Sequence, residues 1–239
     1  TALQGDGTVT IDLAGRAMLP GFVDAHGHVM MIGLQALSAN MLPAPDGEVN
    51  DIASMQRVLG AFAEAFPDRI AAGNLILGFG YDDSQLAEQR HPTREDLDAI
   101  STEIPVAVVH QSGHIGVLNS RALEVVGFDA TTAERPGGVI RRNADGTPNG
   151  VLEETPFFEA LIGLLGALDE NAMRIMFRAG TDLIASYGYT TAQEGRASTG
   201  QAQLMQVVAS EEGLDIEVVA YPDVLVDRDY IAETARPDY

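Results

Sequence analysis

Two histidines separated by one residue are the strongest indication of chemistry in this sequence. His26 and His28 directly follow the segment 21–25, Gly-Phe-Val-Asp-Ala, whose apolar character favours a short β-strand. Side chains two residues apart in a strand share a face, so both imidazoles are expected close together at the carboxyl end of this strand. Such a pair suits one divalent cation, with Asp24 on the same face to orient a ring. A loop with two solvated histidines is the alternative interpretation.

Apolar periodicity predicts the elements that must hold these residues in place. Residues 8–13 alternate with a period of two, which favours a β-hairpin near the start of the chain. The Asp145-Gly146 turn predicts a second hairpin, between residues 137–142 and 147–152. The other predicted elements are helices at 51–66, 121–126, 170–187 and 199–212, the start of a helix at 227–235, and strands at 74–79, 105–110, 189–194 and 214–221. The alternation of helix and strand from residue 169 onward is typical of parallel α/β construction.

Four segments resemble a known family. They are LPGFVDAHGHV (19–29), HQSGHIGVLNSRAL (110–123), GGVIRRNADGTPNGVLEET (137–155) and YGYTTAQEG (187–195). The first is similar to the first-strand signature of the amidohydrolase superfamily of metal-dependent hydrolases. All four are similar, in the same order, to the YtcJ-like branch of that superfamily, which is typified by N-substituted formamide deformylase.

The resemblance implies an α/β fold: a partial (β/α)8 TIM-type barrel with a large insertion after strand 1 and a remnant of a small β-sandwich. The implied domains are residues 1–20 as the end of the sandwich, 21–43 with barrel strand 1, 44–165 as an inserted α+β subdomain, and 166–239 with barrel strands 2 and 3. The bridging lysine and the later histidine ligands of the family have no counterpart, because the chain has no lysine and no histidine after His114. We therefore expect the chain to be about the first half of an enzyme.

The resemblance also implies roles for particular residues. His26 and His28 become metal ligands from barrel strand 1. The groups expected to contact substrate or to support these ligands are Asp24, His114, Glu154 and Glu194. For Glu194, an ion pair with Arg196 is the preferred interpretation. For His114, a hydrogen bond to the backbone at a strand end is an equal alternative.

Four further side chains can take part in chemistry. We expect His110, at the end of a predicted strand, to pack in the interior, and His91, before a proline, to lie in a surface turn. Asp82 and Asp83 follow the segment Gly-Phe-Gly-Tyr and are expected to contact substrate. That segment lacks the third glycine of a dinucleotide-binding motif, so it does not predict a nicotinamide cofactor.

The implied function is metal-dependent hydrolysis of the C–N bond of an amide, formamide or cyclic amide. A metal held partly by His26 and His28 would activate water, and the general base is expected beyond the end of the chain. Zinc is the first choice of metal, with manganese, iron and nickel as alternatives. A second hypothesis is an inactive or incomplete barrel fragment with a role in assembly. A third is a different α/β barrel in which the His-Gly-His sequence is accidental.

Composition narrows the classes of partner. The chain of 239 residues has 14 basic and 35 acidic residues, which gives a net charge of −21 and a pI near 4.3. This charge repels phosphate backbones and anionic membranes, so we expect a small-molecule substrate and neither nucleic acid nor a membrane. All the basic residues are arginines and there is no cysteine, which excludes Schiff-base lysines, disulfides and thiolate sites within the chain. We expect a cytoplasmic protein, with the periplasm as an alternative, and leave a homo-oligomer open.

Overall fold

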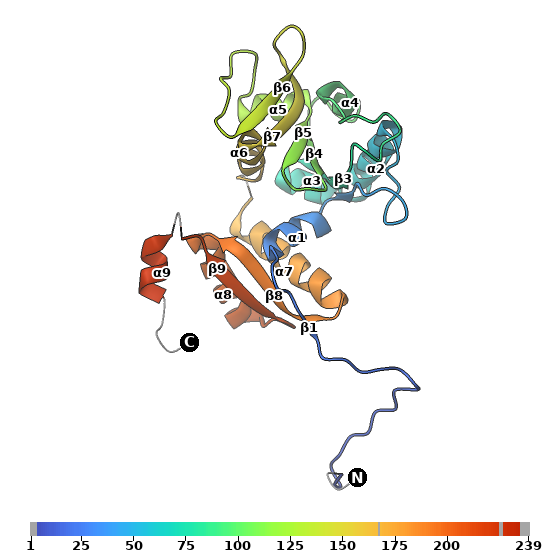
Figure 1. The fold of residues 1–239 in the computed structure, drawn as a ribbon, viewed down its shortest axis with the longest axis vertical. Coiled ribbons are helices and arrows are strands. Elements are labelled where there is room, and N and C mark those ends of the chain that lie inside the picture. The colour runs from blue at the N-terminus through green and yellow to red at the C-terminus, as the bar shows by residue number, and fades with distance from the viewer. Residues whose placement is uncertain (1–3, 167, 225–226, 235–239) are drawn as a thin grey trace.

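The computed structural model describes residues 4–166, 168–224 and 227–234 and contains two β-sheets (Figure 1). One sheet has six strands and comes from the middle of the chain. The other has three strands, one from near the N-terminus and two from the C-terminal part. Helix α1 (Val29–Ala36) leads from the three-stranded sheet to the six-stranded one.

The six-stranded sheet is mixed. Its strand order is β2-β3-β4-β5-β7-β6, in which β2, β3 and β4 are parallel neighbours and each later pairing is antiparallel. The strands are β2 (Ala39–Asn40), β3 (Ile76–Tyr81), β4 (Val106–His110), β5 (Ile115–Leu118), β6 (Gly138–Arg142) and β7 (Pro148–Glu154). The helices from this part of the chain are α2 (Ile52–Ala65), α3 (Pro67–Gly73), α4 (Arg94–Asp98), α5 (Ser120–Val126) and α6 (Thr155–Leu165).

The three-stranded sheet is entirely parallel, with the order β1-β8-β9. Its strands are β1 (Phe22–Val23), β8 (Tyr189–Ala197) and β9 (Glu217–Pro222). The helices of this part are α1, α7 (Glu170–Ser186), α8 (Thr199–Glu212) and α9 (Arg228–Thr234). Strands alternate with helices here, as the sequence predicts.

Local signals in the sequence define several of these elements. Asp51 caps α2 because its carboxylate accepts a hydrogen bond from the Ser54 N–H, while the Ser54 hydroxyl accepts one from the Asp51 N–H. Asp169 caps α7 in the same way by accepting from the Ala172 N–H. Strands β6 and β7 form the predicted hairpin. The predicted hairpin and the predicted helices at 51–66 and 170–187 are confirmed.

A close helix contact joins α1 to α7 through two glycines. A Cβ atom on Gly33 would lie 1.9 Å from the carbonyl oxygen of Met176, and one on Gly180 would lie 2.2 Å from that of Val29. Only glycine permits such an approach of two backbones. All six strands of the six-stranded sheet lie between α1 and α7 in the sequence, so the contact joins two distant segments of the chain.

One hydrophobic core extends between the two sheets, and a second lies within the six-stranded part. The first includes Leu34 of α1, Phe79 of β3, Phe157 of α6, Phe177 of α7 and Ala192 of β8, all buried. The second is centred on α2, β3 and β4. The shared core fixes the position of the six-stranded part against the parallel sheet.

In the part of the chain that the structure describes, no helix has the length and hydrophobicity needed to span a bilayer.

One expectation about the architecture needs correction. The predicted hairpin at residues 8–13 is wrong: residues 4–21 contain no strand in the structure, and the segment extends away from both sheets (Figure 1). Its alternating apolar residues Val9, Ile11 and Leu13 are exposed, because none of the described segments pairs with it and covers them. The parallel strands β1, β8 and β9 form an open sheet, and the described residues contain no closed barrel, so the predicted partial barrel stays a prediction. The mixed α/β class itself is confirmed.

Candidate active site

His26 and His28 lie where β1 ends and α1 begins. Backbone hydrogen bonds tie this segment to β8: the Asp24 N–H donates to Thr191, and the Gly195 N–H donates to Gly27, at 2.9 and 2.8 Å. The two imidazole rings lie edge to face with their centroids 5.5 Å apart. Both rings line the same cavity. The structure therefore brings together the two residues that the sequence singles out first.

Asp24 supports the backbone of this turn. Its carboxylate accepts hydrogen bonds from the N–H groups of His26 and Gln193, at 3.1 and 3.2 Å. A Cβ on Gly27 would lie 1.9 Å from Asp24 Oδ2, so the glycine makes room for this carboxylate. The expectation that Asp24 orients an imidazole is corrected, because its hydrogen bonds go to peptide groups on both sides of the site.

Glu194, on β8, faces His28. The residue is only 4% exposed, its Oε2 accepts a hydrogen bond from the Met30 N–H at 2.7 Å, and its Oε1 lies 3.8 Å from His28 Nδ1. Burial raises the pKa of Glu194 above its ordinary value, although the Met30 N–H and His28 favour the charged form.

The expected ion pair between Glu194 and Arg196 is wrong. Arg196 pairs with Asp223 instead, with Nε and Oδ2 2.7 Å apart. The register of β8 against β9 shifts between Gly195 and Ala197, and Arg196 has a φ of +71°. This irregularity breaks the alternation on which the expectation rested.

His114 and Glu154 form a separate pair at the start of β5 and the end of β7. His114 Nδ1 lies 3.0 Å from Glu154 Oε2, and the Glu154 N–H donates to the carbonyl of His114 at 2.8 Å. Glu154 has a φ of +56°, a conformation that side chains other than glycine rarely adopt. His114 lines the same cavity as His26 and His28, and Glu154 reaches this region through its contact with the His114 ring. Contact of either residue with substrate stays a prediction.

The cavity, of about 1190 Å³, lies between the parallel sheet and the six-stranded part. Polar groups line it from both sides: His26, His28 and Glu194 from the parallel sheet, and Gln111 and His114 from the six-stranded part. Most of the remaining lining is apolar, including Met30, Phe79, Phe158, Leu161 and Ile162. A concave site with a largely apolar wall and a few converging polar groups is typical of small-molecule binding.

Comparison with known proteins assigns the family. A model of the amidohydrolase family matches residues 9–237. The chain belongs to the amidohydrolase family. Within this family it is similar to the N-substituted formamide deformylase of Arthrobacter pascens, with 34% identity over 144 residues, or 60% of this chain and 25% of the relative. It is also similar to the putative amidohydrolase YtcJ of Bacillus subtilis (strain 168), with 30% identity over 145 residues, or 61% of this chain and 26% of the relative.

Solved structures support the fold of this amidohydrolase chain. An uncharacterized metal-dependent hydrolase from Pyrococcus horikoshii OT3 matches it with a TM-score of 0.63 and 21% identity, over 90% of this chain and 38% of the other. One from Pyrococcus furiosus matches with a TM-score of 0.60 and 20% identity, over 90% and 40%. The chain thus spans about a quarter of the two relatives and two fifths of the solved chains.

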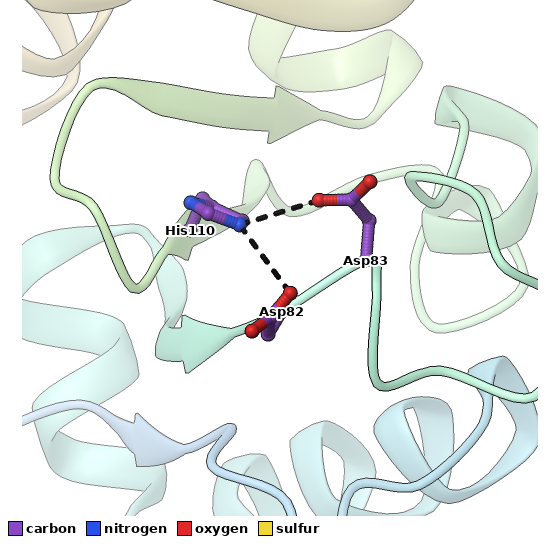
Figure 2. A group of neighbouring side chains, drawn as sticks. All are labelled: Asp82, Asp83 and His110. Carbon is purple, nitrogen blue, oxygen red and sulfur yellow. Dashed lines mark ion pairs between the residues drawn. The ribbon is translucent and has the colours of Figure 1, made fainter.

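A second group of side chains in the amidohydrolase chain was not anticipated as a unit. Asp82 and Asp83 follow β3, and His110 ends the neighbouring strand β4 (Figure 2). The ring of His91 lies beside His110, and its Nδ1 is 3.0 Å from the hydroxyl of Tyr81. The prediction of a surface turn for His91 is wrong, because its side chain is only 9% exposed.

One signal in the sequence points to this second group. Two aspartates follow one buried strand and a histidine ends the next, and neighbouring parallel strands place their carboxyl ends at one edge of a sheet. No pattern in the sequence predicts that His91 is buried beside this group, because its burial depends on contacts with Tyr81 and His110 that form only in the folded chain.

Proposed function

We propose that this chain contributes to the active site of a metal-dependent hydrolase that cleaves the C–N bond of an amide, formamide or cyclic amide. The observation that carries the proposal is the pair of imidazoles, 5.5 Å apart, that line one cavity beside the buried carboxyl of Glu194. Membership of the amidohydrolase family and similarity to a formamide deformylase support the type of bond. The relatives are about four times longer than the matched region, so the proposal assigns the remaining ligands and the general base to residues outside this chain.

The residues present fit a divalent cation, with zinc as the first choice. His26 and His28 supply imidazole nitrogens, which suit zinc and the other transition metals of this type. When bound, the metal would lower the pKa of water and polarise the scissile carbonyl. The hydrogen bonds of Asp24 to the backbone hold the turn that presents both rings.

Glu194 acts in this proposal as the group that positions His28. Its carboxyl joins the start of α1, through the Met30 N–H, to the ring of His28. A histidine ligand is commonly oriented by a carboxylate at its other nitrogen. His114 lies on the wall from the six-stranded part, where, with Glu154 as its partner, it would contact the substrate.

The proposed domain organisation follows the same logic. Residues 21–43 and 166–239 would form part of a (β/α)8 barrel, supported by the parallel order β1-β8-β9. Residues 44–165 would be an insertion that supplies the apolar wall, and residues 1–20 would belong to a small β-sandwich. A small molecule with an apolar portion would then lie between the barrel and the insertion, against Phe158 and Ile162.

Metal analysis tests the proposal directly. We expect the purified protein to contain a divalent metal by mass spectrometry, and the variants His26→Ala and His28→Ala to lose the metal that these rings hold. His114→Ala is the matched control, because it removes an imidazole from the same cavity and should keep that metal. Equal metal content in the wild type, His26→Ala and His28→Ala would refute the assigned ligands.

A further inference from the structure

We propose that Asp82, Asp83 and His110 form a second site for a divalent cation, separate from the pair of His26 and His28. One ligand atom from each of the three residues lies within 4.8 Å of the other two. All three side chains converge on one point (Figure 2). The site belongs to the six-stranded part of the molecule, on strands that do not carry the histidine pair.

The fold brings these ligands together at the edge of parallel strands. Strands β3 and β4 are parallel, and Tyr81 at the end of β3 is paired in register with His110 at the end of β4. The chain leaves β3 directly into Asp82 and Asp83. Side chains at the carboxyl ends of parallel strands are well placed to bind ligands, because neighbouring strands present them at one edge.

The distances between the ligand atoms suit a metal better than a shared proton. His110 Nε2 lies 3.3 Å from Asp83 Oδ1 and 3.9 Å from Asp82 Oδ1. A charge-assisted hydrogen bond between these groups would be about 2.7–2.9 Å long. Two ligand atoms each about 2.1 Å from a tetrahedral metal lie about 3.4 Å apart. The 3.3 Å separation already has about this length, the 3.9 Å separation is about 0.5 Å longer, and the ligand atoms of the two aspartates lie within 4.8 Å of each other.

The charges around the site also favour a cation. Asp82 and Asp83 supply two carboxylates, and among the described residues their ion-pair partners are imidazoles and not arginines. His91 Nδ1 lies 3.6 Å from Asp83 Oδ1 and 3.0 Å from the hydroxyl of Tyr81. The Arg141 guanidinium is paired with Glu153.

Supporting hydrogen bonds hold the ligands in place. Asp82 Oδ2 accepts from the side-chain amides of Gln85 and Gln111, and Oδ1 accepts from the N–H and the hydroxyl of Ser84. Rotation of the Ser84 hydroxyl is enough to free a lone pair on Oδ1 for a metal. Asp83 is 34% exposed at its side chain and provides the route of entry from solvent.

One imidazole and two carboxylates suit a borderline cation such as Zn²⁺ or Mn²⁺. A cation here would fix the chain segments that follow β3 and β4. Gln111, which bonds to Asp82, also lines the large cavity, so the cation would hold one polar group of that cavity in position. Its role would be structural, at the wall opposite His26 and His28.

The site is tested in protein that carries His26→Ala and His28→Ala, so that the first site cannot contribute. Zn²⁺ titration by calorimetry and Mn²⁺ titration by electron paramagnetic resonance should still show one bound cation. Adding Asp83→Asn or His110→Ala should weaken its binding by more than about 100-fold, beyond the 10–100-fold typical of losing only a supporting residue. Asp68→Asn, at an exposed aspartate of α3, is the control and should change nothing.

Two outcomes would overturn the second site. One is the absence of a bound cation in the background that lacks His26 and His28, with a folded protein by circular dichroism. The other is binding that neither Asp83→Asn nor His110→Ala weakens. Both are independent of the first site, whose own failure appears as unchanged metal content in the single variants His26→Ala and His28→Ala.

Discussion

The two candidate metal sites are built on strands of opposite character. His26 and His28 follow β1, which has only two residues, Phe22 and Val23, that are 51% and 67% exposed. Asp82 and Asp83 follow β3, in which all six residues are buried. The first site is therefore held mainly by backbone hydrogen bonds to β8 and by the packing of α1 on α7. The second is held by strands that are themselves part of the core.

This difference shows that a site with a recognisable sequence motif is not necessarily the site that the fold holds most rigidly. The recognisable motif His-Gly-His lies on the less buried strand, so its geometry depends on what packs behind it. The unanticipated group of Asp82, Asp83 and His110 needs less support, because both strands that present it are fixed by burial on both sides. Changes to the α1–α7 contact should thus affect the two sites unequally.

The largest effect is expected for Gly180→Ala. The new Cβ would lie 2.2 Å from the Val29 carbonyl, so α1 and α7 must separate, at a cost of about 1–3 kcal/mol in the free energy of unfolding. Urea denaturation measures this cost. Metal binding at His26 and His28 should weaken in the same variant, while binding at Asp82, Asp83 and His110 should not.

Gly60→Ala is the matched control for that prediction. Gly60 lies within α2, and a Cβ atom added there would meet no neighbouring side chain within 4 Å, so alanine should stabilise the protein by about 0.5–1 kcal/mol. A Gly180→Ala protein as stable as the wild type would show that α1 and α7 tolerate the added methyl group. Unchanged metal binding at His26 and His28 would show that the α1–α7 contact does not determine the first site.

The next largest effect is expected for Glu194→Ala. The variant leaves the buried Met30 N–H without an acceptor, which costs about 1–3 kcal/mol. Glu194→Gln keeps an oxygen for this N–H and should cost less. Chemical denaturation of the two variants separates loss of the hydrogen bond from loss of the charge.

The charge of Glu194 also gives a pH dependence with a definite sign. Because burial raises the pKa of Glu194 in the folded protein, stability from this group is complete below its ordinary pKa of 4.5 and is lost as pH rises through the folded value. In metal-free protein, the stability of the wild type relative to Glu194→Gln should therefore fall as pH increases from about 4. A difference that grows with pH would contradict the burial of this carboxyl.

The smallest effect is expected for Tyr81→Phe, at the second site. Phenylalanine keeps the buried ring and removes the 3.0 Å hydrogen bond between the hydroxyl and His91, so the expected cost is about 1 kcal/mol. Thermal denaturation measures it. Cation binding should change little, since His91 supports the site without belonging to its three ligands. A complete loss of cation binding would mean that His91 orients the ligands more directly than proposed.

Local features of the sequence predicted most of the elements. Asp51 and Asp169 mark helix starts through side chains that bond within four residues, and the Asp145-Gly146 turn fixes a hairpin. The strand that would impose a period of two ends at Val23, before either histidine. The two rings come together instead through the bend at His26 and the bridge of His28 to Glu194, which the strand pattern did not reveal.

Features that depend on distant contacts could not be predicted in this way. The partner of Arg196 is Asp223, just beyond the end of β9, and the irregular register of β8 that directs it there leaves no mark in the sequence. The burial of His91 depends on the position of β4 beside β3. The N-terminal alternation at residues 8–13 is a strand pattern without a partner among the described residues, and period alone does not reveal whether a partner exists.

The contact of Gly33 with Gly180 has a consequence for how such a protein can diversify. The segment between α1 and α7 forms the six-stranded part, and its two ends meet where α1 packs against α7. Lengthening a loop whose ends are already joined costs little entropy. The segment between α1 and α7 also has a hydrophobic cluster of its own, on α2, β3 and β4. Evolution can therefore replace the wall that carries Phe158 and Ile162, and with it the lining of the cavity, while the histidine pair on the opposite wall stays as it is.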